Sequence, residues 1–237
     1  MAGLNAALAA SDRQFVLDRA DAYIGVLIDD LVTRGTNEPY RMFTSRAEYR
    51  LMLRADNADL RLTDKGRMIG CIGQARSKAF DRRLSELERA RTLMRGLAAT
   101  PNELVKEGVA VNMDGVRRTA AELLGYPGID FARLCLIWPE LRGFSASTIE
   151  QLEVDARYQG YLTRQEADIR AFRRDEALKL PADLDYAAIG SLSIEVRSKL
   201  AATRPATLGA AARISGVTPA ALTALLRHVK REERLSA

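Results

Sequence analysis

Apolar residues recur at the three- and four-residue spacing of an α-helix along most of this chain of 237 residues. The segment 76–97 is the clearest case, because Phe80, Leu84 and Leu87 mark one face while arginines mark the other. The same spacing predicts helices over 20–33, 60–68, 114–124, 131–137, about 147–176, and three short ones starting near 193, 207 and 218. The pattern predicts an all-α fold, a multi-helix bundle followed by a small three-helix C-terminal module. A short hairpin near residues 24–44 is the alternative.

Composition shifts divide the chain into three expected ranges. Residues 1–20 start with a short Ala-rich stretch that could bury little alone and looks like the end of something larger upstream. Residues 21–155 form an expected first helical subdomain, and residues 156–237 a second one. Within the second, the Pro-containing stretch 180–184 predicts a linker, so the last module covers about 181–237.

Residue counts exclude several function classes. The two cysteines, Cys71 and Cys135, have no CxxC spacing, which argues against a disulfide scaffold or zinc site and suits a reducing cytoplasm. A single histidine, His228, leaves no hydrolytic triad, and no glycine-rich nucleotide loop is present. No apolar run is long enough to span a membrane. The net charge of +5 permits nucleic-acid binding without showing it.

A basic stripe is the first candidate site. Ser45 and Glu48 have capping-box spacing, which predicts a helix that places Arg46, Arg50 and Arg54 on one face. Arg41, Arg61 and Lys65 lie nearby in the sequence. Arginine suits phosphate because its planar guanidinium donates two parallel hydrogen bonds. The alternative is a solvated helix face whose arginines pair with Glu48, Asp56 and Asp59.

Two tyrosines one helical turn apart are the second candidate. Tyr158 and Tyr161, flanked by Arg157 and Arg164, could stack on bases or on a partner helix. Tyrosines at this spacing more often pack in a core, and the residues alone favour that interpretation.

The C-terminal module offers a third candidate. Residues 214–219 join two short helices through a Gly turn, as in a helix-turn-helix, and the last helix carries Arg227, Lys230 and Arg231. That helix has no Asn or Gln near its start to read bases, so DNA recognition is weakly supported. Small three-helix units serve equally as protein-docking modules.

Four segments of the sequence resemble the MnmG (GidA) family. The longest runs from Gly35 through the stretch Thr44-Ser45-Arg46-Ala47-Glu48 to Leu51 and on to Arg61. The others are residues 2–7, 158–165 and 213–221. Together these segments extend along the whole chain, and the first of them is long and unusual.

The resemblance implies the C-terminal helical region of a larger flavin enzyme. Members of this family use FAD, reduced by NADH, form homodimers and work with the GTPase MnmE. The pair adds aminomethyl or carboxymethylaminomethyl groups to C5 of the wobble uridine in certain tRNAs. The flavin-binding parts and the catalytic cysteines lie upstream of the stretch present here, and Cys71 and Cys135 match neither cysteine. The resemblance therefore implies no catalytic, cofactor or metal residue in this chain, which is not expected to turn over alone.

The resemblance also implies two binding roles for this region, tRNA contact and MnmE docking. The expected tRNA-binding residues are Arg41, Arg46, Arg50, Arg54, Arg61 and Lys65. The expected docking residues are Arg213, Ile214, Val217, Leu222, Leu226, Arg227 and Lys230. Two rivals remain open: a helix-turn-helix-like DNA-binding module, and a purely structural module with solvated basic faces.

Overall fold

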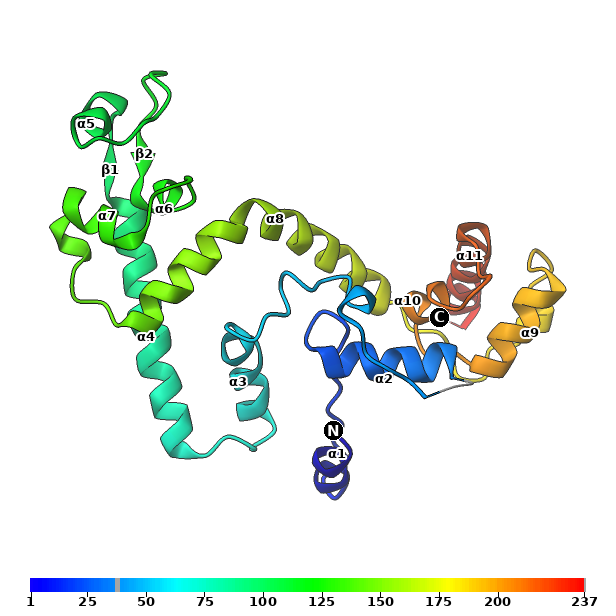
Figure 1. Ribbon diagram of the computed structural model, residues 1–237. Helices are drawn as coiled ribbons and strands as arrows, with labels where there is room; N and C mark the ends of the chain where they lie inside the picture. The colour runs from blue at the N-terminus through cyan, green and yellow to red at the C-terminus, as the bar shows by residue number, and fades with distance from the viewer. Residues whose placement is uncertain (37–38, 237) are drawn as a thin grey trace. The chain divides into compact units, whose positions relative to one another are not determined.

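The computed structural model describes residues 1–36 and 39–236, with the backbone alone for residues 34, 230 and 232–236. Helices dominate this part of the chain (Figure 1), and the expected all-α class is confirmed. The α-helices are α1 (Ala2–Ala9), α2 (Tyr23–Arg34), α3 (Ala58–Met68), α4 (Gln74–Gly96), α5 (Pro101–Lys106), α6 (Ala120–Leu123), α7 (Phe131–Ile137), α8 (Ala146–Glu176), α9 (Ile194–Thr203), α10 (Leu208–Ala212) and α11 (Pro219–Ser236). Short 3₁₀ helices are η1 (Thr44–Arg46), η2 (Pro139–Leu141) and η3 (Tyr186–Ala188).

The chain folds into two compact units. Unit 1 combines Met1–Leu53 with the residues from Arg164 onward, and unit 2 is Arg54–Thr163. Helix α8 belongs to both, since its residues 146–163 lie in unit 2 and residues 164–176 in unit 1. This division by compactness differs from the sequential ranges 1–20, 21–155 and 156–237, which stay predictions.

Unit 2 has a core of leucines and aromatic residues supplied by α4, α6, α7 and the start of α8. Leu87, Leu123, Leu134 and Phe131 are at most 2% exposed. Each such side chain stabilises the fold by about 1.5–3 kcal/mol through the removal of apolar surface from water. Two capping boxes start helices here, at Thr100 for α5 and at the equivalent position of α6.

A two-stranded antiparallel sheet completes unit 2. Strand β1 (Ala98–Ala99) pairs with β2 (Arg118–Thr119), so that Ala98 lies opposite Thr119. The sequence pattern did not predict this sheet, because strands of two residues are too short to show alternation.

Unit 1 contains the three-helix C-terminal module expected from the sequence. Helices α9, α10 and α11 surround a core in which Leu200 and Leu225 are fully buried. The polypeptide from Leu180 to Leu192 packs on the same core, so the expected linker is an integral part of this module. A smaller cluster of Val26, Ala47 and Leu53 joins α2 to the segment after η1.

The helix predicted from Ser45 is wrong. Only η1 is helical, and residues 48–53 form turns. Two carbonyls that would accept α-helical hydrogen bonds accept side-chain donors instead: that of Arg46 from Arg19 (3.2 Å) and that of Glu48 from Gln165 (3.2 Å). Buried Ala47 and the side-chain bonds thus override the local helical pattern. Consequently Arg46, Arg50 and Arg54 do not form a stripe on one helix face.

Two further expectations need correction. The hairpin alternative near 24–44 is wrong because α2 runs through its first half, and residues 39–43 form no strand. The helix predicted over 114–124 shrinks to α6, since Gly115 has φ of +74° and cannot continue a helix. The guanidinium of Arg118 bonds the Asp114 carboxylate (2.7 Å) and the Val116 carbonyl (2.9 Å), which closes this stretch into a loop.

Candidate nucleic-acid interface

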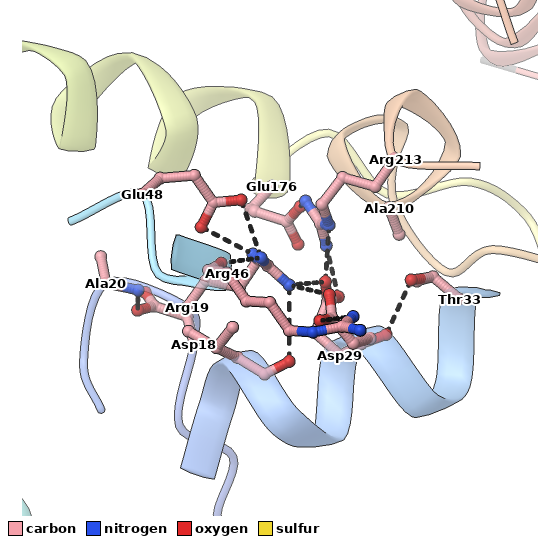
Figure 2. Close-up of polar contacts among 12 residues, drawn as sticks. Asp18, Arg19, Ala20, Asp29, Thr33, Arg46, Glu48, Glu176, Ala210 and Arg213 are labelled. Carbon is pink, nitrogen blue, oxygen red and sulfur yellow. Dashed lines mark hydrogen bonds and ion pairs between the residues drawn. The ribbon is translucent and has the colours of Figure 1, made fainter. Parts of the chain in front are cut away.

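A charged network surrounds the side chain of Arg19, which is 3% exposed, in unit 1. We call it the Arg19 cluster, and its members are Arg19, Asp29, Asp30, Glu48, Glu176 and Arg213. Figure 2 labels all of them except Asp30. Arg19 donates through Nη1 to Asp30 (2.7 Å) and Asp29 (2.9 Å), and through Nη2 to Glu48 (2.7 Å). Its planar guanidinium thereby ties α2 to the segment that follows η1.

Arg213 is the second cation of the Arg19 cluster. Its Nε and Nη2 donate to the two oxygens of Asp29, at 2.7 and 2.6 Å, and its Nη1 donates to Glu176 at 2.5 Å. The guanidinium also lies over the ring of Phe172, 5.5 Å from its centroid. Because Asp29 receives both Arg19 and Arg213, it connects α10 of the C-terminal module to α2 (Figure 2).

The electrostatics of the cluster keep both arginines charged. Burial lowers the pKa of Arg19, but hydrogen bonds to Glu48 and Asp30 outweigh it and raise that pKa above its ordinary value. The pKa of Arg213 is raised in the same way, with burial again opposing the hydrogen bonds to Asp29 and Glu176. Cations held this firmly serve as fixed anchors rather than as proton donors.

The Arg19 cluster fixes the backbone of the segment from Pro39 to Leu53, which we call the signature loop. Arg19 donates to the carbonyls of Arg46 in the loop and of Val26 in α2. From α8, the Gln165 side chain donates to the Glu48 carbonyl, and the ring of Phe172 packs against Tyr49 at 5.8 Å. The loop is therefore ordered by contacts made from Arg19, which precedes α2, and from α8.

Three arginines of the signature loop face solvent. The guanidinium of Arg46 is stacked over the Tyr40 ring at 4.8 Å, while its side chain is 39% exposed and 3.5 Å from Asp30. Arg41 is exposed and lies over Phe43, itself 49% exposed, at 5.0 Å. Arg50 is exposed and makes no hydrogen bond or ion pair with any residue that the structure describes. Where cations alternate with exposed aromatic rings, the cations can bind phosphates and the rings can stack on bases.

Tyr40 connects this exposed face to the buried cluster. Its hydroxyl donates to Asp30 at 2.9 Å. Burial and this hydrogen bond to a carboxylate raise the pKa of Tyr40. The hydrogen bond to Asp30, a member of the Arg19 cluster, thus orients the Tyr40 ring over which Arg46 is stacked.

The remaining expected tRNA-binding residues lie in unit 2 and are engaged internally. Arg54 pairs with Asp56 (3.0 Å) and Asp155 (2.9 Å), and its side chain is only 11% exposed. Arg61 donates to Asn57 at 2.9 Å and to the Arg54 carbonyl at 3.1 Å. The side chain of Lys65 is half-buried on α3. Of these contacts, only the pair of Arg54 with Asp56 was named in the structural alternative considered for the basic stripe.

Most of the expected docking residues serve the interior of the C-terminal module. Ile214 is buried in its core, and Val217, Leu222 and Leu226 pack against that core. Arg213 belongs to the Arg19 cluster, whereas Arg227 is exposed on α11. The side chain of Lys230 lies outside those that the structure describes, as do Asn37 and Glu38 of the family-like segment.

The sequence interpretation missed Arg19, Asp29 and Asp30. The helical phase contained a signal, because Val26, Asp30 and Thr33 follow one another at i, i+4 and i+7 on the buried face of α2. A carboxylate on that face requires a buried cation as its partner. Arg19, which lies outside any helix, could not be identified as that cation from spacing.

Metal, dinucleotide and thiol sites each require particular structural features. The described part of the chain contains no group of three or more His, Cys, Asp or Glu side chains placed to hold a metal ion. Its strands are two residues long and antiparallel, whereas a dinucleotide site of the common type needs a parallel sheet followed by a glycine-rich turn. Burial raises the pKa of the Cys135 thiol, which makes it a poor nucleophile. No described helix has the length and apolar character needed to cross a membrane.

Fold and side chains define a helical region of two units that presents arginines on an anchored loop. Two family models match it. Residues 74–166 match the tRNA modifying enzyme MnmG/GidA C-terminal helical domain, and residues 168–237 match the C-terminal helical bundle of the same enzyme. The chain belongs to the MnmG/GidA family, and it corresponds to that family's C-terminal helical region.

Curated relatives and solved structures agree with this assignment. The chain is 47% identical over 234 residues to the tRNA uridine 5-carboxymethylaminomethyl modification enzyme MnmG of Granulibacter bethesdensis, and 46% identical over 235 residues to that of Syntrophobacter fumaroxidans. These matches cover 98% and 97% of this chain but 37% and 36% of the relatives. Two crystal forms of Aquifex aeolicus GidA superpose with TM-scores of 0.82 and 0.79, at 36% and 34% identity, over 96% of this chain and 36% and 35% of those chains. The chain thus spans little more than a third of the length of the curated relatives it matches.

Proposed function

We propose that this chain is the tRNA-binding and MnmE-docking region of an enzyme that adds (carboxymethyl)aminomethyl groups to C5 of the tRNA wobble uridine. The names of its relatives support the reaction. One structural observation supports tRNA binding: Arg41, Arg46 and Arg50 are exposed on a signature loop whose backbone is held by a buried cation. An ordered loop loses little conformational entropy when its arginines engage phosphates.

The test is a titration of the chain with tRNA at several salt concentrations. Replacement of Arg41, Arg46 and Arg50 by Ala is expected to weaken binding by at least about tenfold. If each contacts one phosphate, the slope of log K against log salt falls by about 2 to 3, because fewer counterions are released. The matched control replaces Arg76, Arg95 and Arg142, which are exposed in unit 2, and removes the same charge from another surface.

The outcome shows whether RNA binds specifically to the loop arginines or is attracted by the net positive charge of the chain. Equal losses in the two triple variants would show that net charge alone attracts RNA, and unchanged affinity would assign the loop arginines a structural role. Duplex DNA of random sequence in the same titration separates the tRNA-binding proposal from the helix-turn-helix alternative, which expects the tighter binding to DNA.

The proposal extends to partners and cofactors. MnmE docks on the C-terminal module, the parent enzyme is a cytoplasmic homodimer, and FAD and NADH bind to the part of it that this chain does not contain. The short antiparallel strands of the described residues support placing the flavin elsewhere.

This placement of the cofactor predicts that the purified chain is colourless. Its visible absorbance spectrum after mixing with excess FAD and gel filtration should show no flavin band. A yellow preparation with one flavin per chain would place a flavin site within these residues and contradict the prediction.

A further inference from the structure

Two tyrosines of α8 in unit 2 have different environments although they are one turn apart. Tyr158 is half-buried, and the guanidinium of Arg54 lies over its ring at 5.2 Å. Tyr161 is 66% exposed. An exposed tyrosine ring offers a flat apolar surface of the kind on which bases stack. The core-packing interpretation of the pair thus suits Tyr158 and leaves Tyr161 unexplained.

Gly160, next to Tyr161, gives a second and independent observation. Glycine lowers the stability of a helix interior relative to alanine, and Gly160 lies near the middle of a 31-residue helix. No atom lies within 4 Å of a Cβ built on Gly160, so packing within the structure does not require a glycine there. A missing side chain beside an exposed ring leaves room for a planar group to approach the helix.

The charge around Tyr161 favours a nucleic acid as the approaching group. Arg157 is exposed one turn before Tyr161 on the same helix face. Residues 156–163 contain no Asp or Glu. A phosphate adjoining a stacked base would therefore meet a cation and no carboxylate from this part of α8.

We infer that Tyr161 is a stacking platform for an unpaired RNA base, with Gly160 giving the base access and Arg157 contacting a neighbouring phosphate. This inference rests on the proposed tRNA-binding function and adds recognition of a single-stranded part of the RNA. Aromatic stacking of this kind tolerates any base. The platform therefore distinguishes unpaired from paired nucleotides but does not distinguish one base from another.

The first experiment compares two probes, a stem-loop RNA with an unpaired loop and a blunt RNA duplex with the same stem sequence. Tyr161→Ala in the full chain is expected to bind the stem-loop about tenfold more weakly, which is within the measured range for one stacked base. Duplex binding should not change, and Tyr161→Phe should keep the affinity of the unaltered chain. Circular dichroism melting checks that the variants fold.

The second experiment uses Gly160→Ala. The added methyl group should leave the melting temperature unchanged or raise it, because alanine favours helix, yet reduce stem-loop affinity by filling space beside the helix backbone that the incoming base would use. Gln159→Ala, at an exposed neighbouring position, is the matched control and should leave affinity unchanged. If Gly160 has a purely structural role, Gly160→Ala should bind RNA as the unaltered chain does.

The outcomes separate this inference from the proposed function. Stem-loop affinity that survives both Tyr161→Ala and Gly160→Ala overturns the stacking platform alone. An unaltered chain that binds neither tRNA nor stem-loop overturns the platform and the tRNA-binding proposal together. Capture of MnmE that is lost in Tyr161→Ala, with RNA affinity intact, assigns the ring to a protein contact and also overturns the inference.

Discussion

At the scale of residues, pairing decides which arginines are available to a ligand. The sequence grouped Arg46, Arg50 and Arg54 by spacing, but Arg54 is occupied by Asp56 and Asp155. Arg41, Arg46 and Arg50 are exposed, whereas Arg19 is the buried cation that pairs most closely with Asp30 and Glu48. Spacing could identify the arginines but not their partners, since the partners are up to 101 residues away.

Replacement of Arg19 by Ala is predicted to destabilise unit 1 strongly. Asp30, 2% exposed, would lose its closest cationic partner, and such a loss usually costs about 3–5 kcal/mol. Urea unfolding of the variant and the parent chain measures the difference. Glu195→Gln removes an exposed pair with Lys199 and is the control, expected to change stability little. Comparable stabilities for Arg19→Ala and the parent would mean that the cluster is not a structural anchor.

At the scale of elements, the sequence predicted the long helices well and the signature loop poorly. Helices α4, α7 and α8 begin and end within two residues of their expected bounds because a regular apolar face packs on the core. The pattern failed at residues 114–118, where Gly115 has a positive φ, and at residues 45–53, where Arg19 and Gln165 donate to backbone carbonyls. Those donors belong to tertiary structure, which local periodicity does not contain.

The start of α8 gives a prediction about pH. Glu86 of α4 accepts hydrogen bonds from the backbone and side chain of Ser145 and from the buried Thr148 hydroxyl. These bonds, led by the Ser145 backbone N–H, lower the pKa of Glu86 below its ordinary 4.5. A lowered folded-state pKa means stability that is present above that ordinary value and lost as the pH falls through the lowered one.

Glu86→Gln should therefore lower the free energy of unfolding by about 1 kcal/mol at neutral pH, the usual worth of a helix cap. The difference from the parent chain should shrink towards zero in acid, measured by urea unfolding across the pH range. Glu150→Gln, at an exposed position of α8, is the control. A difference that stays constant with pH would show that the charge of Glu86 is not involved.

At the scale of the whole molecule, unit 1 joins the C-terminal module to the signature loop through Arg213 and Asp29. Most of the residues expected to dock MnmE lie in or against the core of the C-terminal module. The proposed docking of MnmE on this module would then use its exposed residues, of which Arg227 on α11 is one. Core membership could not be separated from surface contact in the sequence, because both use apolar side chains at helical spacing.

Arg227→Glu is predicted to weaken capture of purified MnmE by about tenfold, through reversal of a charge at the contact. Arg95→Glu on α4 makes the same change of charge outside the module and should have no effect. Pull-down at fixed MnmE concentration measures both. Normal capture by Arg227→Glu, together with loss of capture in Arg95→Glu, would move the docking surface to unit 2.

The discontinuity of unit 1 has a consequence for how the chain is made on the ribosome. Asp29 and Arg213 are 184 residues apart, and at typical translation rates that interval takes roughly 10 to 40 s. All of residues 54–163 emerge during the wait, so unit 2 has every residue it needs before unit 1 does. Asp29 of a nascent polypeptide therefore lacks one of its two cationic partners until Arg213 has left the exit tunnel.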